Sequence, residues 1–299
     1  MESRPLRYFV AVAEELNFAR AAGRLGISPP PLSRAIRQLE ADLGTALFRR
    51  TTHSVALTPA GTVLLAEARI ALDALEAAGL RAQRAAATEP KLVLAVKADG
   101  DAGLLEPILA RYASEAAAVP VAVRLCHWQE QPRLLRRGEA DVALVHEPFD
   151  RTGLDAETLA TEGRVVALAA GHPLAARDRV TVADLGVTAD TLHGYIEETR
   201  SKGHDLAQLL TLVGLGGLTP VLPASVAARY PRPGVVYRQI TDAPPAVLAI
   251  AWPQQSRSTA TAALVRVAAS VAEGAEGAAG AAGAARAEDG IWAGHSPKR

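Results

Sequence analysis

An expected helix that begins at Pro29 has an apolar stripe on one face and polar residues on the opposite face. The polar residues are of the types that contact DNA bases. The stripe has the helical spacing i, i+3, i+4, i+7 and i+11 and consists of Leu32, Ala35, Ile36, Leu39 and Leu43. The other face carries Ser33, Arg34, Arg37 and Gln38. Arginine reads guanine and glutamine reads adenine in a DNA major groove, so this face suits base contacts. An ordinary solvated helix face is the alternative interpretation.

Two residue pairs could support nucleophilic or metal chemistry, namely Cys126-His127 and His146-Glu147. Neighbours on a strand point to opposite faces, so Cys126 and His127 cannot easily cooperate. The sequence contains no HExxH, CxxC or GxSxG motif. We therefore expect that the protein is not an enzyme, has no catalytic residue and binds no metal.

Three short helices are expected to position the polar face. Residues 6–13 and 18–25 show apolar stripes at helical spacing, and Asn17 is a suitable N-cap for the second helix. The turn Gly26-Ile27-Ser28 joins that helix to the third. Pro29-Pro30-Pro31 fits the first turn of the third helix, where backbone N–H groups lack helical partners. This arrangement is typical of a helix-turn-helix.

Two extended segments, residues 47–50 and 54–58, follow and predict a β-hairpin wing. Arg49, Arg50 and His53 lie near its tip, where they could reach phosphates or a minor groove. Thr58 and Pro59 then have the cap and first-turn chemistry of a further helix.

Composition is consistent with two or more parts. The 299 residues have a net charge of zero, but residues 1–87 hold 11 basic and 8 acidic residues, against 21 and 24 in the remainder. This mild asymmetry favours DNA binding at the N-terminus. The lone Cys126 excludes an intrachain disulfide, and neither a secretory signal nor a membrane span is evident, so we expect a cytoplasmic protein without a membrane partner.

The stretch LRYFVAVAEELNFARAAGRLGISPPPLSRAIRQLEADLGTALFRRTTHSVALTPAG, residues 6–61, resembles the winged helix-turn-helix of LysR-type transcriptional regulators. The run LSRAIRQLEADLGTALFRR is highly specific to that family. The resemblance implies DNA contacts near Pro30, Ser33, Arg34, Arg37, Arg50 and His53. At the position of Pro29 the family often has a polar residue, commonly glutamine, so a base contact there is in doubt.

The resemblance implies an α/β fold class with an N-terminal winged helix-turn-helix, a long linker helix and a two-lobed, periplasmic-binding-protein-like α/β effector domain. We expect the winged helix-turn-helix in residues 1–58, the linker and dimerisation helix in 59–87 and the effector-binding domain in 88–272. Within that domain, lobe 1 comprises about 88–164 and 246–272, and lobe 2 about 165–245. The Gly/Ala-rich tail, 273–299, is expected to be disordered.

The linker helix carries an expected pairing seam of Leu64, Ala68, Ala71, Leu75 and Ala78. A lone helix of this length needs a packing partner, which favours pairing with a second subunit over packing within its own chain. The implied partners are double-stranded DNA with an inverted repeat, a small-molecule effector, and a second or further copies in a homodimer or homotetramer. RNA polymerase is a further partner that the resemblance allows.

Strands expected at 91–96, 121–125 and 140–145, with helices between them, form a βαβαβ run. Ligands of such sheets sit at the carboxyl ends of the strands. The candidate effector residues are therefore Lys97, Asp99, Asp101, Trp128 and His146, with Thr219 from lobe 2. The family pattern fits residues 187–204 poorly.

Each of these residues has a simpler explanation. Asp99 or Asp101 could be a helix cap, Trp128 could be packing, and His146 could be a satisfied polar residue. Two acids beside Lys97 leave a cationic or hydroxyl-rich effector as well supported as a carboxylate. We expect no cofactor beyond a small-molecule co-inducer of unknown identity. A constitutive DNA-binding protein that has lost its effector is the alternative function.

Overall fold

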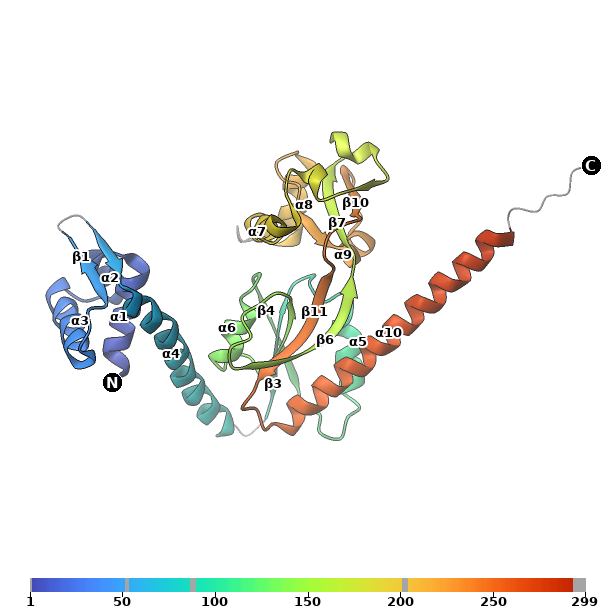
Figure 1. Ribbon diagram of the computed structural model, residues 1–299. Coiled ribbons are helices and arrows are strands. Elements are labelled where there is room, and N and C mark those ends of the chain that lie inside the picture. Colours follow the sequence, from blue (N-terminus) through green and yellow to red (C-terminus); the bar gives the residue numbers. More distant parts are fainter. Residues whose placement is uncertain (1, 52–53, 87–89, 201–203, 293–299) are drawn as a thin grey trace, which may run out of the picture. The chain divides into compact units, whose positions relative to one another are not determined.

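A computed structural model describes residues 2–51, 54–86, 90–200 and 204–292 (Figure 1). The chain divides into two compact units, the first of residues 1–86 with the short segment 136–138, the second of the remainder.

The first unit begins with three helices, α1 (Ser3–Glu15), α2 (Phe18–Leu25) and α3 (Pro29–Leu43). Asn17 caps α2 as expected, since its side chain accepts hydrogen bonds from two backbone N–H groups of the first turn. Gly26 ends α2 with a φ of 67°, a conformation that costs glycine little, and so makes the sharp turn into α3. The expected helix-turn-helix is confirmed.

The core of this unit lies among the three helices and the wing. Its fully or nearly fully buried members include Phe9, Val12, Leu32, Ile36 and Phe48. The wing consists of β1 (Phe48–Arg50) and β2 (Val55–Leu57), which pair antiparallel.

The long helix α4 (Pro59–Ala85) starts directly after the second strand of the wing. Thr58 caps it by accepting a hydrogen bond of 3.0 Å from the Gly61 amide. A Cβ atom at Gly61 would lie 2.2 Å from the carbonyl oxygen of Leu47, so only glycine fits this approach.

Glu14 of α1 forms ion pairs with both α4 and α2. The Glu14 carboxylate is 2.8 Å from a guanidinium nitrogen of Arg69 on α4 and 2.8 Å from one of Arg24 on α2. Burial opposes ionisation of Glu14, but the hydrogen bonds from the two arginines outweigh it and hold its pKa below the ordinary value.

The expected seam of α4 is divided between two environments. Leu64 and Ala68 pack against the helix-turn-helix core, whereas the Leu75 side chain is 49% exposed. The exposed apolar residues at helical spacing i, i+3, i+7 and i+11 are Val63, Ala66, Ile70 and Ala74, which we call the outer stripe. Because alanine occurs on several faces of α4, spacing alone did not separate the face that packs inward from the exposed one.

The second unit contains a five-stranded sheet of order β4-β3-β5-β11-β6. The strands are β3 (Leu92–Lys97), β4 (Val121–Cys126), β5 (Val142–His146), β6 (Leu154–Glu162) and β11 (Ala246–Pro253). β3 pairs parallel with β4 and β5, as the βαβαβ pattern predicts, and β11 runs antiparallel to β5 and β6. The helices α5 (Leu105–Tyr112), α6 (Gln131–Arg136) and α10 (Thr259–Trp292) belong to this part.

A four-stranded sheet of order β8-β10-β7-β9 forms the second lobe. Its strands are β7 (Arg164–Ala169), β8 (Arg179–Val180), β9 (Val221–Pro223) and β10 (Val235–Ile240). Helices α7 (Ala189–Arg200), α8 (Leu206–Gly214) and α9 (Ala224–Arg229) accompany it, with 3₁₀ turns at Pro173–Ala176 and Ala183–Leu185. The chain passes between the lobes twice, from β6 to β7 and from β10 to β11, and the two-lobed α/β fold is confirmed.

α10 continues through the Gly/Ala-rich segment as far as Trp292, and the disorder expected from residue 273 stays a prediction. Alanine has the highest helix propensity, and the first turns of α10 pack on α5, β6 and β11, which supplies the nucleus for extension. Residues 293–299 lie outside the described part of the chain. No helix in the described part is long and apolar enough to cross a membrane.

Candidate nucleic-acid interface and interlobe cleft

The polar face of α3 is open to solvent. Pro30, Arg34 and Arg37 are exposed and Ser33 is half-buried, while Leu32, Ile36 and Leu39 point into the core. The structure therefore brings Pro30, Ser33, Arg34 and Arg37 together on one face of a helix, beginning at its first turn. Gln38 donates a hydrogen bond of 2.8 Å to Asp42 along the same helix, so its amide is held one turn further on.

Arg50, which was expected to contact DNA, takes part in the packing of the wing. Its guanidinium forms a 2.9 Å ion pair with Glu40 of α3 and lies 4.6 Å from the centre of the Phe18 ring. The other carboxylate oxygen of Glu40 accepts hydrogen bonds from the amides of Leu47 and Phe48. Three donors thus tie the wing to α3 through one carboxylate. His53 lies outside the described residues.

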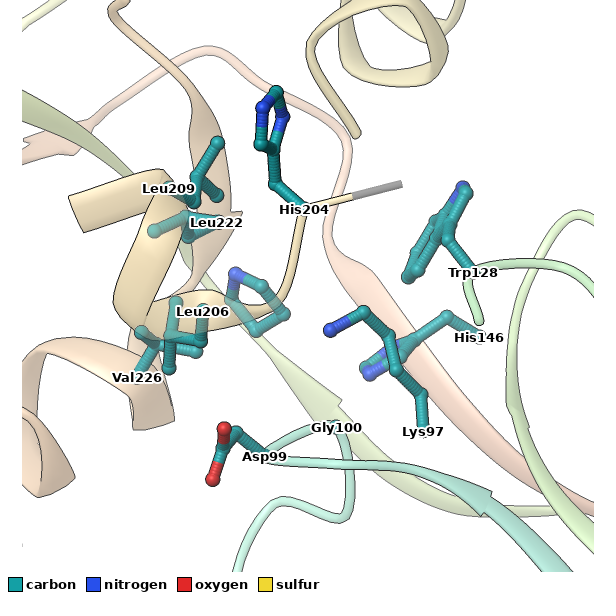
Figure 2. Close-up of a pocket in the computed structure, with 11 residues that line it drawn as sticks. Lys97, Asp99, Gly100, Trp128, His146, His204, Leu206, Leu209, Leu222 and Val226 are labelled. Atoms are coloured by element: carbon teal, nitrogen blue, oxygen red, sulfur yellow. The ribbon is translucent and has the colours of Figure 1, made fainter. Parts of the chain in front are cut away.

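A small cavity lies between the two lobes at the carboxyl ends of the parallel strands (Figure 2). It measures about 30 Å³ in the volume open to the centre of a water molecule. Lobe 1 contributes Lys97, Asp99, Gly100, Trp128 and His146, and lobe 2 contributes His204, Leu206, Leu209, Leu222, Pro223 and Val226. One wall is therefore polar and aromatic, and the other is mostly apolar.

Trp128 and His146 form the aromatic part of this wall. Their ring centres are 5.7 Å apart with an angle of 27° between the planes. The indole N–H of Trp128 donates a hydrogen bond of 2.8 Å to Glu197 of α7. This bond joins the lobes beside the cavity, so Trp128 both lines the pocket and holds it closed.

Asp99 and Asp101, both expected to bind an effector, also join the lobes. The Tyr230 hydroxyl donates to Asp99, and Arg229 donates a bond of 2.6 Å to Asp101. Asp101 does not line the cavity and also accepts a bond of 3.2 Å from the Leu105 amide at the start of α5. Burial would raise the pKa of Asp101, but the hydrogen bond from Arg229 and those from backbone amides lower it below the ordinary value.

Thr219 lies away from the cavity, in contrast to its expected role. The Tyr195 hydroxyl is 2.6 Å from both the hydroxyl and the carbonyl oxygen of Thr219, so the residue links the end of the glycine-rich turn to α7 within lobe 2. The cavity thus gathers Lys97, Asp99, Trp128 and His146 from the expected set and excludes Asp101 and Thr219.

The lobe 2 wall was missed from the sequence. Its clearest local signal is the capping box of Asp205 and Gln208, which marks the start of α8 and so places Leu206 and Leu209 on its first turns. Nothing in the helical pattern says which turn of α8 faces lobe 1. His204 precedes this cap, and its buried Nδ1 has no hydrogen-bond partner among the described residues.

The thiol of Cys126 is poorly suited to nucleophilic chemistry. Burial, together with the nearby charge of Glu130, raises its pKa to about 11, so the reactive thiolate is scarce near neutral pH. No group of three or more metal-binding side chains occurs in the part of the chain that the structure describes.

Residues 3–62 match the family described as bacterial regulatory helix-turn-helix protein, lysR family, and residues 85–188 match the LysR substrate binding domain. The Hca operon transcriptional activator HcaR of Escherichia coli is 31% identical over 272 residues, which cover 84% of this chain and 92% of HcaR. The chain belongs to the LysR family of transcriptional regulators.

Two further similarities extend over different lengths. The HTH-type transcriptional regulator AlsR of Bacillus subtilis is 38% identical to this LysR-type chain over 186 residues, which cover 62% of each protein. The crystal structure of CbnR, a LysR family transcriptional regulator, is 26% identical with a TM-score of 0.55 and covers 91% of this chain and 99% of CbnR.

Membership decides the broad function. LysR-type regulators bind DNA and form oligomers, and the relatives found are regulators and not enzymes. This LysR-type chain is therefore a DNA-binding transcription regulator with a substrate-binding domain.

Proposed function

We propose that this regulator reads DNA with the face of Pro30, Ser33, Arg34 and Arg37, and that a small-molecule effector between the lobes changes its DNA contacts. The carrying observation is the cavity at the strand ends, which is closed by hydrogen bonds from one lobe to the other. Hydrogen bonds between the lobes exist in the closed state and are broken in the open state. A ligand that binds one of these two states more tightly shifts the equilibrium between them.

The cavity has room for about two water molecules, so an organic effector enters only when the lobes separate. Separation breaks the Trp128–Glu197 bond and exposes Lys97 and His146. We propose Lys97, Trp128 and His146 as the effector contacts, with Asp99 released from Tyr230 as the fourth.

Subunits are proposed to pair through the outer stripe of α4. A pair of subunits would then present two α3 helices to an inverted repeat, whose half-site spacing matches the spacing of the helices. Movement of the lobes would alter that spacing or the bending of the DNA, and RNA polymerase bound at the promoter would respond to the change.

Footprinting of the full chain on DNA upstream of its own gene, at stated salt, tests the DNA-reading face. Arg34→Ala should weaken protection of an inverted repeat and relax the preference for one base pair, because a bidentate contact to guanine is lost. Arg177→Ala, a surface change in lobe 2, is the matched control. If Arg34→Ala left both affinity and base preference unchanged, the assignment of this face would fail.

A constitutive DNA-binding protein is the second candidate, and the narrowness of the cavity favours it. The two functions separate when the footprint is repeated with the small-molecule filtrate of the cells that make the protein. A changed footprint that is lost in Trp128→Ala supports an effector in the cleft. An unchanged footprint supports constitutive binding.

A further inference from the structure

A second and larger pocket includes both partners of the Asp99–Tyr230 contact in its lining. It measures about 340 Å³, against about 30 Å³ for the interlobe cavity by the same measure. Its lining consists of Asp99, Leu206, Ala207, Leu210, Arg229, Tyr230, Pro231 and Arg232. This volume is within the range of small-molecule sites, whereas the interlobe cavity is well below it. We call it the outer pocket.

The two cavities share a wall. Asp99 and Leu206 line both, and the hydroxyl of Tyr230 donates to Asp99 at this wall. Leu206 and the Asp99–Tyr230 pair therefore lie where the two cavities adjoin. A molecule in the outer pocket would touch Tyr230 and Arg229, the lobe 2 residues that hold the lobes together.

The outer pocket has an apolar and a cationic side. Leu206, Ala207 and Leu210 come from α8, and Pro231 is the other apolar lining residue. The cationic side comes from Arg229 and Arg232. Against these two guanidinium groups, Asp99 is the one carboxylate among the described lining residues. Asp101 pairs with Arg229 from outside the lining, so the nearby charges balance. Arg232, which hydrogen-bonds to a carbonyl and a hydroxyl, supplies the local positive charge beside the apolar surface.

Two hydrogen bonds to α8 hold the Arg232 guanidinium in place. One terminal nitrogen donates a bond of 3.0 Å to the Ala207 carbonyl, and the other donates a bond of 2.9 Å to the Thr211 hydroxyl. Arginine has five N–H donors, so these two bonds fix the plane of the group and leave donors for a ligand. A planar fork of this kind matches a carboxylate, which it binds through two parallel hydrogen bonds.

We propose that the outer pocket binds a small monocarboxylate with a compact apolar body. The carboxylate lies on Arg232, and the apolar body packs against Leu206, Leu210 and Pro231. This site shares Asp99 and Leu206 with the interlobe cleft of the proposed function, but Leu210, Pro231 and Arg232 line the outer pocket alone, so the two sites can be tested separately.

Leucine methyl NMR of the full chain tests this site with isocaproate, a branched monocarboxylate, as the probe. Leu210 lines the outer pocket only, while Leu209 and Leu222 line the interlobe cavity only. The Leu210 methyl resonances should shift and saturate as isocaproate is added, and those of Leu209 and Leu222 should stay in place.

Three comparisons identify the chemistry. The neutral amide 4-methylpentanamide has the same shape and should bind at least about tenfold more weakly, and Arg232→Gln should weaken isocaproate binding by a similar factor. Arg232→Lys keeps the positive charge but loses the planar fork. Its affinity for isocaproate should therefore lie between that of the parent protein and that of Arg232→Gln. Arg177→Gln, on the surface of the same lobe, should leave the Kd unchanged.

Three results would overturn the proposal. Equal binding of acid and amide would exclude recognition of the carboxylate, and the absence of any saturable shift would exclude the site for this ligand class. Shifts at Leu209 and Leu222 without Leu210 would place the ligand in the interlobe cleft, which would support the proposed function while refuting the outer pocket. Without probe, unchanged methyl resonances of leucines in the lobe 1 core, such as Leu94 and Leu144, show that Arg232→Gln is folded.

Discussion

Arg229 of lobe 2 donates a hydrogen bond of 2.6 Å to the carboxylate of Asp101 in lobe 1, 128 residues earlier in the chain. Asp101 is 6% exposed, whereas the Arg229 side chain is 38% exposed. The carboxylate is thus fixed within lobe 1, where it also accepts the Leu105 amide, and the arginine reaches it from the other lobe. Closure of the lobes depends on this pair and on the bonds of Asp99 and Trp128.

Asp101→Asn should destabilise the closed effector domain by about 1–2 kcal/mol, because a charge-assisted hydrogen bond is replaced by a weaker neutral one. Partial exposure of Arg229 keeps the effect below that of a fully buried pair. Urea unfolding of the full chain measures the change. Glu115→Gln, in a long and exposed ion pair with Arg266, is the matched control and should change little. If Asp101→Asn lost no more unfolding free energy than Glu115→Gln, the Asp101–Arg229 pair would not stabilise the closed lobes.

The stabilisation from Asp101 should depend on pH in one direction. Its pKa in the folded protein lies below the ordinary value of 3.8, so the unfolded chain takes up the proton first. The contribution is complete above pH 3.8 and is lost as the pH falls through the folded pKa. Unfolding free energies of the parent and Asp101→Asn should differ by a constant amount at neutral pH and converge below 3.8. Convergence at higher pH would contradict the lowered pKa.

Gly61→Ala should destabilise the first unit by about 1–3 kcal/mol, since the new Cβ would overlap the Leu47 carbonyl, which is backbone and cannot move aside cheaply. Gly79→Ala, in the same helix, has no atom within 4 Å of the added carbon and should stabilise by up to about 1 kcal/mol. Thermal unfolding of both variants checks the opposite signs. Equal effects would mean that the backbone approach at Gly61 does not constrain the fold.

Ile70→Lys should weaken subunit association through the outer stripe. The side chain is 40% exposed in the single chain, and burying it against another subunit would contribute on the order of 1 kcal/mol for each copy, or about thirtyfold in Kd for two symmetry-related copies. Sedimentation velocity over a range of concentrations measures the shift. Leu215→Lys places the same charge on a side chain that is 78% exposed in lobe 2 and should not alter association. Similar behaviour of both variants would place the interface elsewhere.

Local chemistry made much of the fold predictable. The cap at Asn17, the cap at Thr58 and the turn at Gly26 each depend on neighbours within a few residues, and all three occur as expected. Lys97 and His146 were placed beside the cleft by a rule of topology, because the ends of parallel strands meet at one edge of a sheet.

The contacts that could not be predicted are those that tertiary packing creates. Arg50 has the type of a phosphate contact, but Glu40, ten residues earlier, pairs with it. Asp101 meets Arg229, and Thr219 meets Tyr195, through packing that no local spacing encodes. In each case the fold gives a polar side chain a partner within the chain that the sequence analysis did not predict.

The carboxylate of Glu40 has a consequence for how regulation can reach the DNA. Because it accepts two wing amides and the Arg50 guanidinium, α3 and the wing move as one rigid body. The angle between recognition helix and wing is then not an adjustable quantity within a subunit. In the proposed function, a signal from the effector domain would then act on the separation and phase of two such bodies along the double helix, while the base contacts within each half-site would stay the same.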